Sequence, residues 1–159
     1  MTLEVAKKIL NSYRMESERV NILRAQLEEV DSLAQSIRSP EITGMPHGNS
    51  TTDKTGKYAV RIKSILDSLE EAEDSAERAW NELQKIISQM PENTADDTRR
   101  RVVLELRYLD LLSWTRVTRG LYGQKPDFEA RKESYYRQVT RIHGRALKAV
   151  CAVLEGRET

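Results

Sequence analysis

The stretch that decides the fold lies between Tyr58 and Met90 and reads YAVRIKSILDSLEEAEDSAERAWNELQKIISQM. Apolar or small side chains recur through it at alternating steps of four and three residues. This spacing places them along one side of an α-helix, as in the seam of a coiled coil. Pro91 follows and ends the helix, because proline lacks the backbone N–H that would continue it. The seam positions are Tyr58, Ile62, Ile65, Leu69, Ala72, Ala76, Ala79, Leu83, Ile86 and Met90.

A similar seam runs through residues 3–37. Its steps also alternate between three and four, with one irregularity between Ser17 and Leu23 that indicates a local phase shift. The pattern ends before Pro40. The seam positions are Leu3, Ala6, Leu10, Tyr13, Ser17, Val20, Leu23, Leu27, Val30, Ala34 and Ile37.

Two helices of nearly equal length can fold back on each other, so we predict an antiparallel hairpin. Its helices are expected at about residues 2–38 and 54–90, joined by a long connection, residues 39–56, that is rich in glycine and proline. Charged residues make up 32% of the chain, with seven glycines and four prolines, a composition typical of helix-rich proteins. We therefore predict an all-α fold with a coiled-coil hairpin at residues 1–91 and a small helical bundle at residues 92–159.

Charge divides unequally along the chain. Residues 1–94 hold 12 basic and 16 acidic side chains, a balance of −4, and residues 95–159 hold 14 and 9, a balance of +5; the two sum to the net charge of +1. A positive C-terminal third fits a nucleic-acid-binding module attached to another part. Because the excess is modest, we expect one copy to bind weakly.

The longest C-terminal pattern predicts an amphipathic helix that begins near Ser134. Its basic residues, Arg137, Arg141, Arg145 and Lys148, recur at steps of four, four and three and form one stripe. Aliphatic side chains occupy the other side. Such a helix could enter a major groove or lie against a phosphate backbone. The alternative is a solvated face that binds nothing. The aliphatic positions are Val139, Ile142, Ala146, Val150 and Val153.

Two shorter helical patterns precede this helix, LELRYL at residues 104–109 and SWTRV at residues 113–117. Ser113 is expected to cap the second. We expect Tyr108 and Trp114 to pack in the core rather than to stack on bases.

A helix is also expected to begin after Pro91, capped by Asn93 or Thr94. Arg99, Arg100 and Arg101 cluster on it. They either contact phosphates or only lie on the solvent-exposed side of the helix.

Taken together, these patterns resemble the helix-turn-helix of sigma-factor region four. Within that group they are similar to small phage-encoded regulators of the ArpU/RinA late-transcription type. The residues that carry the resemblance are Leu106, Arg107, Tyr108, Leu112, Ser113 and Trp114, then Tyr136, Val139, Arg141, Ile142, His143, Arg145, Ala146 and Leu147. The resemblance implies a DNA-binding transcription regulator of a phage or prophage, in the cytoplasm of a bacterial host cell.

The resemblance also implies which residues contact duplex DNA. The helix from Ser134 would be the recognition helix, with its N-terminal part in the major groove. The groove-facing candidates are Tyr135, Tyr136, Arg137, Gln138 and Arg141. The candidates for the phosphate backbone are Arg145, Lys148, Arg99, Arg100 and Arg101.

The chain departs from this pattern between the two helices of the motif. Helix-turn-helix proteins join them by three or four residues, whereas residues 121–132 intervene here and Pro126 interrupts any helix. Either this basic insertion extends the DNA contact through Lys125, Arg131 and Lys132, which we favour, or it spoils the docking geometry.

No catalytic constellation is evident, so we expect no enzymatic activity, cofactor or metal. Five acids crowd the second long helix, and helical pyrophosphohydrolases hold magnesium with paired acids, but a solvated face is the preferred interpretation. The lone Cys151 is compatible with a reducing cytoplasm, and no run approaches the roughly 18 apolar residues of a membrane span. The acids are Glu70, Glu71, Glu73, Asp74 and Glu77.

The expected partners are double-stranded DNA and, through the hairpin, either a second copy of the chain or RNA polymerase. The alternative function is that of a coiled-coil interaction protein whose helix-turn-helix is degenerate and serves only as packing.

Overall fold

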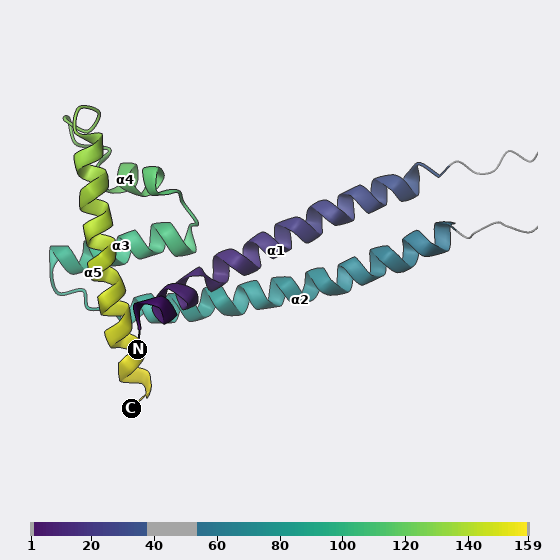
Figure 1. The fold of residues 1–159 in the computed structure, drawn as a ribbon, viewed down its shortest axis with the longest axis horizontal. Coiled ribbons are helices and arrows are strands. Elements are labelled where there is room, and N and C mark those ends of the chain that lie inside the picture. Colours follow the sequence, from purple (N-terminus) through teal and green to yellow (C-terminus); the bar gives the residue numbers. More distant parts are fainter. Residues whose placement is uncertain (1, 38–53, 159) are drawn as a thin grey trace, which may run out of the picture. The chain divides into compact units, whose positions relative to one another are not determined.

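A computed structural model describes residues 2–37 and 54–158, and all regular structure within them is helical (Figure 1). The predicted all-α fold is confirmed. Residues 39–53 of the predicted connection lie outside the described residues. The elements are α1 (Leu3–Gln35), α2 (Lys54–Ser88), α3 (Ala95–Leu104), a π-helical turn η1 (Glu105–Leu109), α4 (Trp114–Tyr122) and α5 (Lys132–Glu158).

The chain forms two compact units, one of Met1–Met15 with Ala76–Thr159 and one of Glu16–Ser75. This division differs from the boundary that we predicted at residue 91. Ile86 and Ile87 are both buried, and neighbouring positions on a helix point about 100° apart. A two-helix seam covers only one of these directions, so the end of α2 needs further partners. The buried cluster that supplies them contains Ala6, Leu10, Leu83, Ile86, Ile87, Met90, Leu104, Tyr108, Ala146, Leu147, Val150, Cys151 and Leu154.

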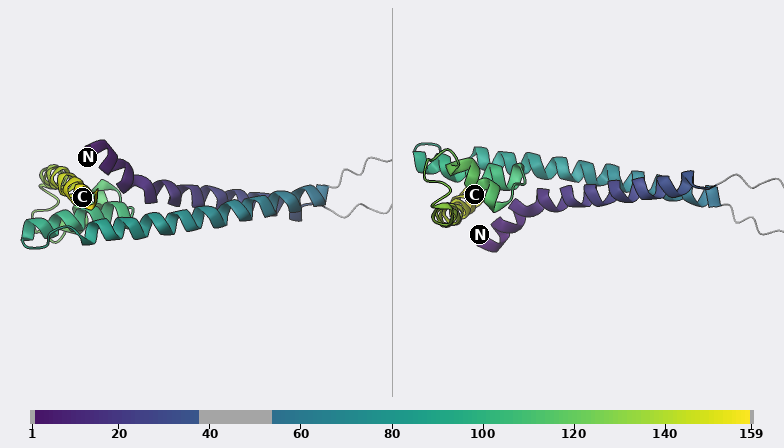
Figure 2. Two further views of the ribbon diagram at one scale, coloured as in Figure 1. Left: turned by 90° about the horizontal axis from the view of Figure 1, so that it is seen from below. Right: turned by 90° about the horizontal axis from the view of Figure 1, so that it is seen from above.

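Within Glu16–Ser75 the two helices run antiparallel and side by side (Figures 1 and 2). An ion pair joins them, in which Arg24 Nη2 lies 2.7 Å from Glu73 Oε1. The predicted hairpin is present in this unit. Its buried seam residues are Val20, Val30, Ile65 and Ala72.

The C-terminal helices form a small bundle in which α5 packs against α3 and α4. Val103, Val117, Val139 and Ile142 are the centre of its core. Thr94 caps the N-terminus of α3. Its hydroxyl accepts a hydrogen bond from the Asp97 N–H at 3.1 Å, and the Asp97 carboxylate accepts one from the Thr94 N–H. Of the two cap residues that the sequence allowed, Asn93 and Thr94, the structure uses Thr94.

A tight turn separates η1 from α4. Leu111 adopts a left-handed conformation with φ of 56°, and the Leu112 N–H donates to the Leu106 carbonyl at 2.9 Å. This bond spans one residue more than the six-to-one bond with which helices commonly close on a left-handed residue. Ser113 then caps α4 by accepting from the Arg116 N–H at 3.4 Å, as predicted.

The connection between α4 and α5 is the long insertion that the sequence predicts. Residues 123–131 form consecutive turns, with the Phe128 N–H bonded to the Lys125 carbonyl and the Arg131 N–H bonded to the Asp127 carbonyl, both at 3.0 Å. The Phe128 side chain is buried. The insertion is therefore anchored to the bundle.

Candidate nucleic-acid interface

The outward face of α5 carries the predicted cationic stripe. Arg137, Arg141 and Lys148 are exposed, whereas the aliphatic residues on the opposite side are mostly buried in the core. Arg137 is 74% exposed and lies 3.6 Å from Glu133, an ion pair that contributes little at the surface. Within the described residues, no carboxylate pairs with Arg141 or Lys148. These cations are available to a partner.

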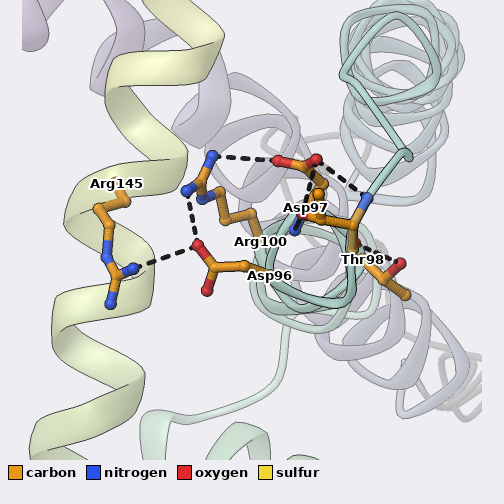
Figure 3. Close-up of polar contacts among 6 residues, drawn as sticks. Asp96, Asp97, Thr98, Arg100 and Arg145 are labelled. Carbon is orange, nitrogen blue, oxygen red and sulfur yellow. Dashed lines mark hydrogen bonds and ion pairs between the residues drawn. The ribbon is translucent and has the colours of Figure 1, made fainter.

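Arg145 differs from the other members of the stripe because it faces α3. Its Nη1 donates to Asp96 Oδ2 at 3.1 Å, and the same oxygen accepts from Arg100 Nη2 at 2.6 Å (Figure 3). Arg100 also donates to Asp97 Oδ1 at 3.1 Å. One carboxylate thus holds two guanidinium groups and links the first turn of α3 to the middle of α5.

The basic cluster at residues 99–101 is split by the fold. Arg99 is exposed, but Arg100 is held by Asp96 and Asp97, as described above. Arg101 is 18% exposed and forms an ion pair with Glu92. Arg100 and Arg101, two of the candidates for the phosphate backbone, are thus partly buried and paired within the molecule.

Tyr135 is buried at 5% exposure, so its predicted position on the groove face is wrong. Its ring stacks on Tyr122 at 4.8 Å and on Phe128 at 6.0 Å. Its hydroxyl donates to Asp127 Oδ1 at 2.8 Å. This hydrogen bond raises the pKa of Tyr135 and lowers the pKa of Asp127. Tyr135 therefore anchors the insertion.

Several of the candidates line two surface hollows beside α5. The first has a volume of about 330 Å³ and lies between α3 and α5. It brings Arg99, Gln138, Arg141 and Arg145 together, with Asp96 as its acid. Residues that are far apart in sequence thus share one largely basic surface.

The second hollow lies between α4 and the start of α5 and has a volume of about 520 Å³. Lys132, Tyr136 and Arg137 line it, with Phe128 and two threonines. The threonines come from α4 and escaped the sequence prediction, as did the exposed Arg116 and Arg119. Their signal was available, because polar residues recur every three to four positions in WTRVTRGLY. The threonines are Thr115 and Thr118.

The basic residues of the insertion have local partners. Arg131 lies 3.3 Å from Asp127 and sits 5.8 Å from the centre of the Tyr135 ring. Lys132 lies 3.6 Å from Glu129. Lys125 is exposed and pairs with no acid among the described residues.

Four of the residues that carry the resemblance, Arg107, Tyr108, Trp114 and His143, pack together in one cluster. His143 lies edge-on to Trp114 at 4.7 Å, and its Nε2 shares a 2.9 Å hydrogen bond with the Tyr108 hydroxyl. Arg107 covers the Trp114 ring at 4.7 Å and donates to the Leu112 carbonyl at 2.8 Å. His143 thus makes a packing contact within the bundle.

Burial sets the charge state of this cluster. Desolvation, with the nearby Arg107 and Lys7, lowers the pKa of His143 to about 4. Burial raises the pKa of Tyr108. The imidazole is therefore neutral near pH 7 and adds no positive charge to α5.

The structure offers no metal centre within residues 2–37 and 54–158, since no three His, Cys, Asp or Glu side chains converge there. The acids of α2 are exposed, and one of them, Glu73, is paired with Arg24. In the same residues, every helix is too short or too polar to span a bilayer.

Comparison of the chain with models of protein families, with curated proteins and with solved structures found no match.

Proposed function

We propose that this chain is a DNA-binding transcription regulator of a phage or prophage, and that it binds duplex DNA through the outward face of α5. The observation that carries the proposal is the exposure of Arg137, Arg141 and Lys148 on one side of a helix whose other side is fixed in a core. The resemblance of the C-terminal motif to sigma-factor region four supports the same assignment.

In this proposal the N-terminal half of α5 enters the major groove. Arginine is suited to base reading there, because its guanidinium can donate two hydrogen bonds to one guanine. Tyr136, Arg137, Gln138 and Arg141 are the residues placed to reach base edges or the flanking phosphates. Arg99, Lys148, Lys125 and, from α4, Arg116 and Arg119 would contact the backbone.

The unit at Glu16–Ser75 would serve a protein partner, either a second copy of the chain or the RNA polymerase of a bacterial host cell. Four large apolar side chains are exposed on it and would contribute apolar area to such a contact. They are Ile22, Leu33, Val60 and Leu66, with exposed fractions of 61%, 40%, 71% and 47%.

A double substitution tests the DNA-binding face. We expect Arg137→Ala with Arg141→Ala to weaken binding to a cognate duplex by about 1–3 kcal/mol, measured by fluorescence anisotropy. The matched control is Arg61→Ala with Lys63→Ala, which removes the same charge from exposed positions on α2. If the double variant on α5 binds as tightly as the parent, the assignment of this face is wrong.

The second candidate function is that of an interaction protein in which the hairpin alone is active. The exposed apolar residues of Glu16–Ser75 favour it. Light scattering coupled to size exclusion distinguishes the candidates together with the duplex titration. An oligomer that binds no duplex at low salt would support the interaction protein and exclude the regulator.

A further inference from the structure

Gly144 occupies the middle of the exposed face of α5, three residues after Arg141 and four before Lys148. Glycine at such a position costs about 0.5–1 kcal/mol relative to alanine, because it loses more backbone freedom when the helix forms. Such a cost can be offset where the missing side chain makes room for a neighbouring group.

The described part of the molecule supplies none. A Cβ at Gly144 would meet no atom within 4 Å, and φ at this residue is not positive. Gly120 and Gly123 differ, since a Cβ at Gly120 would lie 3.1 Å from Leu106 Cδ1 and one at Gly123 would collide with the Arg119 carbonyl. Those two glycines make room for the protein's own atoms, whereas Gly144 leaves bare backbone facing outward.

Charge surrounds this bare backbone on both sides. Arg141 and Lys148 lie about one helical turn before and after it, and neither is paired with an acid among the described residues. Arg137 continues the same face, while Arg145 is turned toward Asp96. The result is a notch without a side chain, flanked by cations, which suits an anionic chain that must approach closely.

We infer that Gly144 is the point at which the sugar–phosphate backbone of duplex DNA passes closest to α5, with a phosphate between Arg141 and Lys148. This inference rests on the proposed function and deepens it, because it assigns the middle of α5 to the backbone. Glycine is the residue that allows such close approach of two backbones. A side chain at this position would hold the phosphate away from both cations.

The test is Gly144→Ala, with Gly144→Leu as a larger step and Gly156→Ala as the control. Gly156 is also an exposed glycine of α5 whose added Cβ would meet no atom within 4 Å. The probe is a labelled mixed-sequence duplex of about three helical turns at about 50 mM salt, where phosphate contacts dominate binding. Stability is followed in parallel by thermal unfolding.

We expect Gly144→Ala to raise Tm by about 2 °C, because alanine favours the helix, and yet to weaken binding about threefold to tenfold. Gly144→Leu should weaken it further, and Gly156→Ala should leave it unchanged. Such a gain in stability with a loss of binding excludes unfolding as the cause.

If the parent binds and Gly144→Ala binds as tightly, the inference is overturned while the proposed function stands. A lower Tm for Gly144→Ala would also overturn it, because the added Cβ would then have met a neighbour. If the parent fails to bind the duplex, the proposed function fails.

Discussion

His143 joins three segments of the C-terminal bundle through its ring. It contacts Tyr108 of η1 and Trp114 of α4 from its place on α5. A charged imidazole would lose solvation there and would lie near Arg107 and Lys7. The neutral form is therefore part of the folded state, and the stability of the bundle depends on pH.

The direction of this dependence follows from the two pKa values. The pKa of His143 is about 4 in the folded chain and about 6.5 when unfolded, so the unfolded state binds more protons between these values. The contribution to stability is complete above pH 6.5 and is lost as pH falls toward 4. We expect a loss of about 2 kcal/mol, reduced from the full value by the partial exposure of the ring.

Urea unfolding at pH 7 and pH 4 measures this loss. His143→Phe keeps an aromatic ring without a titrating group, so the difference between the parent and this variant isolates the histidine from the carboxylates. An identical pH dependence in both proteins would contradict the assignment.

Asp96 reduces the positive charge of the surface formed by α3 and α5. It holds Arg145 and Arg100 and adds negative charge beside the hollow between α3 and α5. Asp96→Asn should free Arg145 and tighten duplex binding about threefold. Exposed Asp110→Asn removes the same charge elsewhere and should have a smaller effect. Equal gains in the two variants would show that net charge alone determines affinity.

At the scale of elements, the insertion between α4 and α5 is a structured part of the bundle. Phe128 is 4% exposed, and Asp127 and Tyr135 hold the segment to the first turn of α5. Lys125 and Arg131 therefore occupy defined positions on an anchored segment, and their contact with DNA stays a prediction.

Phe128→Ala should therefore destabilise the protein by about 3 kcal/mol, because it leaves a cavity under the insertion. Lys125→Ala, on the same segment but exposed, should change the free energy of unfolding by less than about 0.5 kcal/mol. Chemical denaturation checks both values. A negligible effect of Phe128→Ala would mean that the insertion is not anchored by its aromatic residue.

Part of the helical layout follows directly from sequence spacing. The seams predicted α1 and α2, and the caps at Thr94 and Ser113 set the starts of α3 and α4. The stripe on α5 predicted the exposure of Arg137, Arg141 and Lys148, but not the pairing of Arg145 with Asp96. These features depend on neighbours within a few turns of helix, and local pattern is sufficient for them.

The predictions that failed concern residues whose neighbours belong to other segments of the chain. Tyr135 follows the polar Ser134 near the helix start, and its burial depends on Phe128 and Asp127 of the insertion. Arg100 depends on where Asp96 and Asp97 point. Spacing along one helix contains no information about such partners.

At the scale of the whole molecule, the C-terminal bundle shares a core with the start of α1 and the end of α2. Ala6, Leu10 and Leu83 are fully buried in the cluster that also contains Ala146 and Val150. A fragment of residues 92–159 would expose this surface to water. The bundle is thus incomplete without residues 1–15 and 76–91.

We expect the fragment 92–159 to show lower helicity per residue than the intact chain and no cooperative thermal transition, measured by circular dichroism. A fragment that melts sharply at the Tm of the intact protein would instead support an independent domain that begins near residue 92.

The central claim is that exposed cations on α5 neutralise DNA phosphates, and the salt dependence of duplex binding tests it most directly. Each phosphate contact contributes about −0.9 to the slope of log K against log salt concentration. The account predicts a steep negative slope for the parent that becomes shallower by about 2 when Arg141 and Lys148 are both replaced by alanine. Absence of binding at low salt, or an unchanged slope in the double variant, would contradict it.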